Sequence, residues 1–281
     1  MAKQKLPIQA FDNKKFLHSH KGRILRVMAE FLEPENRFEK YDVQDTLAFF
    51  GSARTVPLEK SKRQLAALKR KKVVDKKALK RAKMDYEMSM YYEDAVLLSQ
   101  KLAQWTKDTC GGFAISSGGG PGMMEAANKG AKLGGVPSIG LNINLPFEQA
   151  PNPYISEELN FEFYYFFIRK YWFLYTAKAI IAFPGGFGTL DEMMEVLTLV
   201  QTKKVEKDMA IVLYGEKYWK NVINFDYLVD SGTIDEADLE LFHFSKTVDD
   251  AFIYIVSKLE KLIEKRRKND LLRYRRLIVE D

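Results

Sequence analysis

Residues 179–195, AIIAFPGGFGTLDEMME, predict a strand, a glycine-rich turn and a helix in direct succession. The apolar run 179–182 is typical of a buried parallel strand, and the turn is GGFG at 185–188. Thr189 is expected to open the helix, with Asp191 and Glu192 in its first turn. Because a helix start has unpaired N–H groups and a positive dipole end, this stretch predicts a phosphate-binding site.

Glu192 is unusual in such a place, because a bound anion would repel its carboxylate. One interpretation is a capping box of the form Thr-x-x-Glu, with Thr189 as the cap. The other is that the carboxylate faces a sugar hydroxyl or a water instead of the phosphate. The residues of this stretch alone leave both interpretations open.

A second glycine-rich turn, GGGPG at 118–122, also lies between an expected strand and an expected helix. The alternation of strands and helices with short turns predicts an α/β fold, a doubly wound parallel sheet with helices on both faces. Both turns should lie at the carboxyl edge of this sheet, where ligands bind. The expected strands are 46–50, 113–117, 138–143, 179–182 and 209–214, with a short strand or buried edge at 160–167.

Other features frame this sheet. The strand 46–50 ends in small residues followed by Arg54, which suits an anion or nucleotide site. An N-terminal extension, 1–45, contains an expected helix near 21–32 that Pro34 should end. Helices are also expected at 86–106, 123–133, 168–178, 192–203, 218–229, 236–241 and 248–276.

The composition is that of an ordinary soluble chain, with 46% hydrophobic and 29% charged residues among 281. No apolar run approaches the roughly 18 residues needed to cross a bilayer, and the first residues lack the apolar core of a signal peptide. Cys110 is the single cysteine, so no internal disulfide is possible. A cytoplasmic protein is expected.

The net charge of +6 is concentrated in one segment. Residues 59–83 contain twelve Lys and Arg against two acidic residues, a net +10 that leaves −4 for the rest of the chain. A solvated helical insertion is one interpretation of this run. The other is a polyanion-binding arm, although the run has none of the aromatic residues that nucleic-acid modules usually interleave with their cations.

Several classes of site do not fit the sequence. Neither glycine turn has the spacing of the dinucleotide fingerprint, and no Gly-Lys-Ser/Thr follows either one, so neither is a Walker A loop. The three histidines, His18, His20 and His243, are far in sequence from both turns, so histidine acid–base catalysis and a zinc site are not expected. The remaining elements are a phosphate-binding edge, two cations and a few carboxylates.

Three motifs together are similar to a known family. Residues 118–126 (GGGPGMMEA), 167–170 (FIRK) and 184–192 (PGGFGTLDE) strongly resemble the LOG (LONELY GUY) family, often labelled "possible lysine decarboxylase". The resemblance covers about residues 45–255 and implies a Rossmann-like domain at 46–255, with the basic insertion 59–83 inside it and a helical extension at 256–281. It also implies hydrolysis of the N-glycosidic bond of nucleoside 5′-monophosphates to free base and ribose 5-phosphate.

By this resemblance the catalytic pair falls on Arg169 and Glu192, with Glu192 facing the sugar. No metal and no cofactor is implied. A decarboxylase is not expected, because no stretch supplies the lysine and acidic partner that pyridoxal phosphate needs. The expected substrate-binding residues are Gly51, Ser52, Gly119, Gly120, Gly122, Met123, Glu125, Lys170, Gly185, Gly186, Gly188 and Thr189.

One departure bears on the substrate. Plant-type members of the family have His-Glu-Arg-Lys where this chain has Phe167, Ile168, Arg169 and Lys170. This difference favours AMP over cytokinin nucleotides. The alternatives are a non-catalytic nucleotide or molybdenum-cofactor carrier, and a nucleic-acid partner bound through residues 59–83. A homodimer or larger homo-oligomer is expected from the resemblance.

Overall fold

The computed structural model describes residues 7–71, 75–109, 111–146, 150–206 and 208–279, and side chains as far as Arg266. Cys110 and part of the basic run, 72–74, lie outside these residues. Helices are α1 Lys14–Leu17, α2 Arg23–Lys40, α3 Leu58–Lys69, α4 Lys76–Thr109, α5 Met123–Gly134, α6 Phe166–Tyr175, α7 Phe187–Gln201, α8 Glu216–Val222, α9 Phe225–Asp230 and α10 Val248–Val279, with 3-10 turns at Ala10–Asp12, Glu157–Leu159 and Glu236–Leu241.

Seven strands form one sheet in the order β4-β3-β2-β1-β5-β6-β7, and every neighbouring pair is parallel. The chain moves outward from β1 in one direction and then returns to add β5 on its other side. This confirms the predicted α/β doubly wound, Rossmann-like sheet. The strands are β1 Asp45–Phe50, β2 Phe113–Ser117, β3 Ser138–Ile143, β4 Asn160–Phe163, β5 Ala177–Ala182, β6 Ala210–Tyr214 and β7 His243–Ser245.

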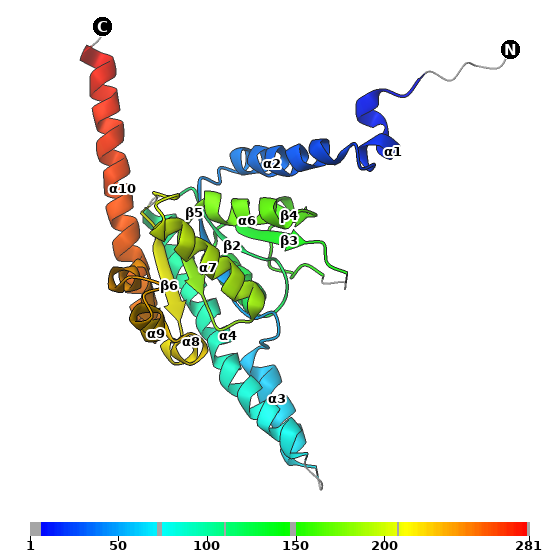
Figure 1. Ribbon diagram of the computed structural model, residues 1–281, viewed down its shortest axis with the longest axis vertical. Helices are drawn as coiled ribbons and strands as arrows, with labels where there is room; N and C mark the ends of the chain where they lie inside the picture. Colours follow the sequence, from blue (N-terminus) through cyan, green and yellow to red (C-terminus); the bar gives the residue numbers. More distant parts are fainter. Residues whose placement is uncertain (1–6, 72–74, 110, 147–149, 207, 280–281) are drawn as a thin grey trace, which may run out of the picture.

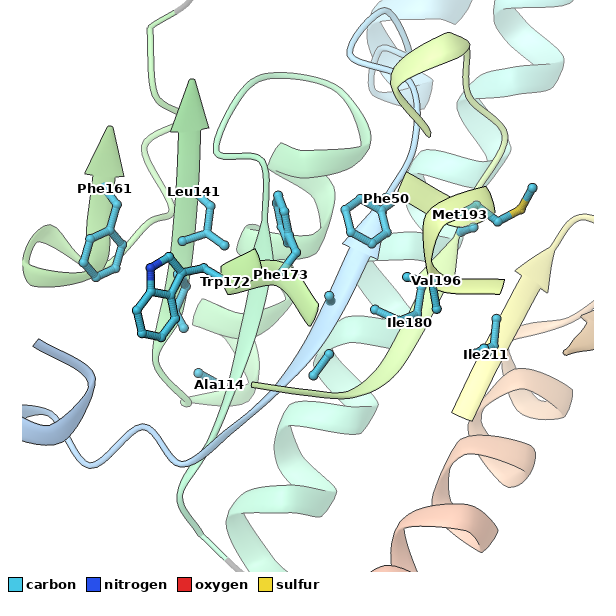
Figure 2. Close-up of a cluster of buried hydrophobic side chains, with 14 of the residues drawn as sticks. Phe50, Ala114, Leu141, Phe161, Trp172, Phe173, Ile180, Met193, Val196 and Ile211 are labelled. Atoms are coloured by element: carbon cyan, nitrogen blue, oxygen red, sulfur yellow. The ribbon is translucent and has the colours of Figure 1, made fainter. Parts of the chain in front are cut away.

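Helices cover both faces of the sheet, as alternation along β1 shows. Ala48 and Phe50 belong to the core beneath α2, α6, α7 and α8, whereas Leu47 and Phe49 pack against α4, α5 and α10. Figure 2 shows the first of these clusters, in which Phe173 of α6 makes an edge contact with Phe50, with 4.9 Å between ring centroids. The two helical layers therefore fix the carboxyl ends of β1 and β5 between them.

Helix α2 does not end at Pro34, which was the expectation, but continues through this buried proline to Lys40. Proline has no N–H for the carbonyl four residues earlier, which is that of Glu30. This carbonyl instead accepts a hydrogen bond from the Trp172 indole at 2.9 Å. The Glu30 carboxylate also accepts the Tyr164 and Tyr165 amides just before α6, so α2 is bonded to the start of that helix.

Other boundaries also differ from the sequence predictions. The segment expected as one helix at 218–229 is divided into α8 and α9, and 236–241 is a 3-10 turn. The edge strand β7 was not predicted, because three residues carry too short a pattern to recognise. The basic run forms α3 and the beginning of α4, which project together from the domain (Figure 1).

Candidate functional site

A cavity of about 800 Å³ lies at the carboxyl edge of the sheet, where the strand order changes direction between β1 and β5. This is the place where ligands bind in open α/β sheets. Its wall is built from the end of β1, the start of α7 and one side of α6. The lining residues among those predicted from the sequence are Gly51, Ser52, Arg169, Gly185, Gly186, Gly188, Thr189 and Glu192, together with Arg54.

Helix α7 begins at Phe187, two residues earlier than expected, with Gly186 as its cap residue and no side-chain cap. The first amide of α7 with a backbone partner is that of Leu190, which donates to Gly186 O at 3.0 Å. Glu192 therefore lies beyond the first turn, and of the two interpretations left open for it, the capping box with Thr189 is not formed. The amides of residues 187–189 have no partner among the described residues, so they are available to an anion.

Two glycines at this helix start are not explained by the protein's own structure. Neither Gly186 nor Gly188 has a positive φ, and a Cβ built on either would meet no heavy atom within 4 Å. Gly185 differs, because a Cβ there would lie 2.1 Å from Thr189 Oγ1. The open space beside Gly186 and Gly188 faces the cavity, which is what close approach of a ligand to the backbone requires.

Arg169 is held on α6 with its guanidinium at the cavity wall. Its Nε donates to Leu141 O at 2.7 Å, and Cζ lies 5.2 Å from the centroid of the Phe173 ring. A Cβ on Gly118 would lie 2.6 Å from Nη2, so glycine at this position makes room for the guanidinium. Burial lowers the pKa of Arg169, and the negative charge of Glu192 opposes that shift.

Glu192 lines the cavity with a side chain that is only 11% exposed. Burial raises the pKa of its carboxyl group, whereas the positive charges of Lys170 and Arg169 act to lower it. A largely buried carboxylate that faces a cavity beside an arginine can stabilise a developing positive charge or orient a water.

Lys170 does not line this cavity. Its Nζ lies 2.8 Å from Asp191, 2.7 Å from Glu195 and 3.6 Å from Glu192, all on α7. Burial disfavours the charged form of Lys170, but its hydrogen bonds to Asp191 and Glu195 outweigh this effect and raise its pKa. The structure thus places Lys170 behind Glu192, in contact with three carboxylates.

The turn 118–122 contributes less to the cavity than was expected from the sequence. Gly118 and Met124 line it, whereas Gly119, Gly120, Gly122, Met123 and Glu125 do not. The first amide of α5, that of Met123, donates to Ser52 O at 3.1 Å, so it is already occupied. Glu125 accepts a hydrogen bond from the Tyr92 hydroxyl at 2.8 Å, which turns its carboxylate toward α4.

A buried amide network that sequence reasoning missed holds the turn 118–122 in place. Asn152 Nδ2 lies 3.0 Å from Gly119 O, 3.1 Å from Gly120 O and 2.8 Å from Asn128 Oδ1. The Asn128 amide in turn donates to Ser138 Oγ at 2.9 Å. The only signal in the sequence was Asn152 beside a proline in a loop. Cavity residues that were also missed include Met88, Met124, Leu145, Phe166 and Tyr218.

The two positions at which the chain departs from plant-type members face away from the cavity. Ile168 is fully buried in the core, and Phe167 is 53% exposed on the outer surface. Neither residue lines the cavity. Within one chain the departure therefore leaves the cavity wall unchanged.

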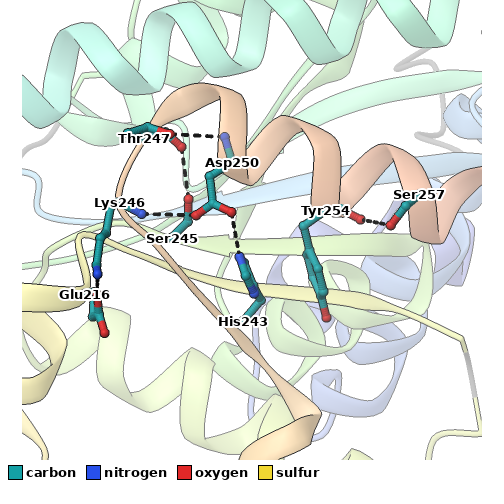
Figure 3. Close-up of polar contacts among 8 residues, drawn as sticks. All are labelled: Glu216, His243, Ser245, Lys246, Thr247, Asp250, Tyr254 and Ser257. Atoms are coloured by element: carbon teal, nitrogen blue, oxygen red, sulfur yellow. Dashed lines mark hydrogen bonds and ion pairs between the residues drawn. The ribbon is translucent and has the colours of Figure 1, made fainter.

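A polar cluster beside the outermost strand β7 caps the start of α10 (Figure 3). The Asp250 amide donates to Thr247 Oγ1 at 3.2 Å, and Asp250 Oδ1 lies 3.0 Å from His243 Nε2. The pKa of Asp250 is lowered, because hydrogen bonds from His243, Ser245 and the Lys246 amide outweigh the effect of burial, which acts in the opposite direction.

Within the described part of the chain, no cluster of His, Cys, Asp and Glu is suited to a metal ion, and no helix is long and apolar enough to cross a membrane.

Comparisons with known proteins bear on the family that the chain resembles. The family model described as "Possible lysine decarboxylase" matches residues 124–255. The cytokinin riboside 5′-monophosphate phosphoribohydrolase LOG7 of Arabidopsis thaliana is 29% identical over 51% of this chain and 64% of its own length. LOG3 of the same plant is 33% identical over 30% of this chain and 38% of its own length. The chain thus spans less than two thirds of these relatives.

A solved structure of a Moco carrier protein from Chlamydomonas reinhardtii is similar at 19% identity and a TM-score of 0.43, covering 78% of this chain and 99% of that one.

The family model includes the start of α5, Arg169 and the whole 184–192 motif, and the relatives are phosphoribohydrolases of the LOG group. The resemblance of this chain to the LOG family, predicted from its motifs, is thereby confirmed.

Proposed function

We propose that the protein hydrolyses the N-glycosidic bond of nucleoside 5′-monophosphates, AMP foremost, to free base and ribose 5-phosphate. The observation that carries this proposal is the meeting of three groups in one cavity: the open start of α7, the Arg169 guanidinium and the Glu192 carboxylate. The activity for which the LOG relatives are named supports it.

In this proposal the 5′-phosphate binds at the start of α7. The amides of residues 187–189 supply donors, and the space beside Gly186 and Gly188 admits phosphate oxygens to the backbone. Arg54 and Arg169 line the same cavity and add positive charge. Fixing the phosphate in this way would position the sugar beside Glu192, one turn further along α7, as orientation of a bound substrate requires.

The reaction needs a negative group near the sugar, because breaking the C1′–N bond builds positive charge on the ribose ring. In its ionised form, Glu192 would stabilise this charge and orient the attacking water. The water oxygen bonds to C1′, and its proton goes to the departing base. Arg169 would hold the substrate from α6 through charge-assisted hydrogen bonds.

Lys170 would act as a positioning residue. Its contacts with Asp191, Glu192 and Glu195 hold these three side chains of α7 in position. Its positive charge also acts to lower the pKa of Glu192, against the effect of burial. We therefore assign it no direct contact with substrate.

The base would lie against the apolar part of the wall. Met88, Met124, Leu145 and Phe166 line the cavity and come from four different segments. One aromatic ring and three flexible or branched apolar side chains form a surface that suits a purine ring. This arrangement supports a nucleotide base as the group that occupies the remainder of the cavity.

The test is base release from AMP, GMP, CMP and isopentenyl-AMP, measured by chromatography. Glu192→Gln is expected to lose at least about 100-fold in rate. Glu195→Gln is the matched control, because this neighbour contacts Lys170 but does not line the cavity, and it should retain activity within about tenfold. No base release by the unmodified protein from any of the four nucleotides contradicts the proposal. Tight nucleotide binding without release, unchanged in Glu192→Gln, would favour a carrier.

A homodimer belongs to the same proposal. Helix α6 and the residues beside it expose Phe167, Tyr171 and Tyr175, and α7 exposes Phe187 at 91%. Exposed aromatic side chains gathered in this way are typical of an interface between subunits. Sedimentation equilibrium should give twice the mass of the chain, and a monomer at micromolar concentration would contradict this assignment.

A further inference from the structure

Helix α3 and the first turns of α4 form an antiparallel pair, here called the basic hairpin (described residues 58–71 and 75–83), which projects from the domain (Figure 1). Its two helices pack through small and apolar residues on their facing sides. Ser61 and Ala82 are buried, and Leu65, Leu68 and Leu79 are half-buried. The hairpin is therefore an ordered helical element whose charged residues are left for the outside.

Every described cation of the basic hairpin is exposed. Within the described part of the chain, Lys62 pairs with Glu59 at 3.0 Å and Arg81 pairs with Asp85 at 2.9 Å, and the other cations of the hairpin form no ion pair. These others are Lys60, Arg63, Lys69, Arg70, Lys71, Lys76, Lys77, Lys80 and Lys83. Because like charges this close repel one another, the accumulated positive charge does not stabilise the hairpin itself.

The arrangement of these cations indicates the partner. Lys76, Lys80 and Lys83 are spaced i, i+4 and i+7, which places them along one side of α4 over about 10 Å. A nucleic-acid duplex carries one negative charge per roughly 1.7 Å of its axis, so such a row can neutralise several phosphates. Lysines are compact point charges that suit phosphate contacts, and phosphate contacts position a protein on a duplex without carrying sequence information.

Other polyanions fit less well. Residues 58–85 contain no aromatic side chain, so the hairpin lacks the stacking surfaces with which proteins bind single strands. No large hydrophobic side chain is exposed among the described residues of the hairpin, so it lacks the aromatic and leucine face that inserts into a membrane. We propose that the basic hairpin binds the phosphate backbone of double-stranded nucleic acid without regard to sequence.

This inference does not rest on the proposed enzymatic function. The hairpin cations lie outside the cavity wall, and the nearest cavity residue on α4 is Met88. Substituting Lys76, Lys80 and Lys83 with glutamine should leave base release from AMP unchanged. The Gly188→Ala variant, altered in the cavity, should bind a duplex as the unmodified protein does.

The experiment measures fluorescence anisotropy of the full chain with labelled DNA and RNA duplexes of about 20 base pairs, between roughly 50 and 200 mM salt. The expected result is a Kd that weakens steeply with salt. In K76Q/K80Q/K83Q the slope of log Kd against log salt should fall by about 3, and binding at about 100 mM salt should weaken roughly 100-fold. The matched control is K132Q/K217Q/K261Q, which removes the same charge from exposed lysines elsewhere.

Three outcomes would overturn the proposal. The first is equal loss of binding in the two triple variants, which would indicate only overall charge. The second is poly-glutamate displacing the duplex at equal charge, which would indicate an acidic protein. The third is equally tight binding to vesicles with about one third anionic lipid, which would indicate a membrane surface. Circular dichroism of both variants confirms that the helices are retained.

Discussion

The turn at 118–122 and the turn at 185–188 both join a strand to a helix, but their glycines serve different ends. In the first, Gly119 and Gly122 have φ values of +76° and +72°, and a Cβ on either would collide with Asn142 Oδ1 or Ser52 O. In the second, Gly186 and Gly188 have ordinary backbone angles and open space. In the turn at 118–122, here called the scaffold turn, the backbone angles and the close packing require glycine. At 186 and 188 neither requires it, so these glycines indicate space for a ligand.

The largest effect is expected on the scaffold turn. Gly122→Ala places a side chain at φ +72°, with its Cβ 2.3 Å from Ser52 O, so the free energy of unfolding should fall by about 3 kcal/mol or more. Urea denaturation measures this change. Gly111→Ala is the matched control, because Gly111 has φ +62° but no neighbour within 4 Å, and it should lose only about 1–2 kcal/mol. Equal losses would show that the collision is unimportant.

The opposite pattern is expected for the turn at α7. Gly188→Ala replaces a helical glycine by a better helix former, so stability should stay the same or rise by up to about 1 kcal/mol. Binding of AMP should weaken by at least about tenfold, because the methyl group occupies the space that we assign to phosphate. Calorimetric titration gives the Kd, and unchanged affinity would contradict that assignment.

Gly118 tests whether one residue of the scaffold turn also serves the cavity. Its φ is not positive, and a Cβ there would meet the ends of two side chains, Arg169 Nη2 at 2.6 Å and Met124 Sδ at 2.7 Å. Gly118→Ala should therefore change stability little but displace the guanidinium, reducing kcat/KM by about tenfold. Steady-state kinetics measures this effect. Full activity with normal stability would remove Gly118 from the positioning of Arg169.

The smallest effect concerns pH. Lys170 lowers the pKa of Glu192, which burial raises. If Glu192 must be ionised, activity falls as pH drops through this pKa, and in Lys170→Met the fall should begin at a higher pH. The pH profile of kcat/KM shows the shift, and Lys170→Arg, which keeps the charge, should restore the original profile. An unshifted profile in Lys170→Met would leave Lys170 only a packing role.

The sheet and the position of its ligand edge could be predicted from the alternation of strands with glycine-rich turns. Helix α7 began two residues early because its start is set by backbone geometry at Gly186, with no capping side chain to signal it. The partners of Lys170 and the Asn128–Asn152 bond depend on contacts between separate elements, which local patterns do not contain. Arg169 and Glu192 came from motifs, and the structure brings both to one cavity.

Pro34 has a consequence for any attempt to transplant this sheet into another protein. The carbonyl that it leaves without a partner in α2 receives the Trp172 indole, three residues beyond Arg169 in α6. A chimaera built from residues 46–255 alone would expose that indole and the amides that Glu30 accepts. Pro34 therefore does not break α2 but frees a backbone carbonyl that accepts a hydrogen bond from α6. The N-terminal segment must accompany the sheet in any such chimaera, because it supports the helix that carries Arg169.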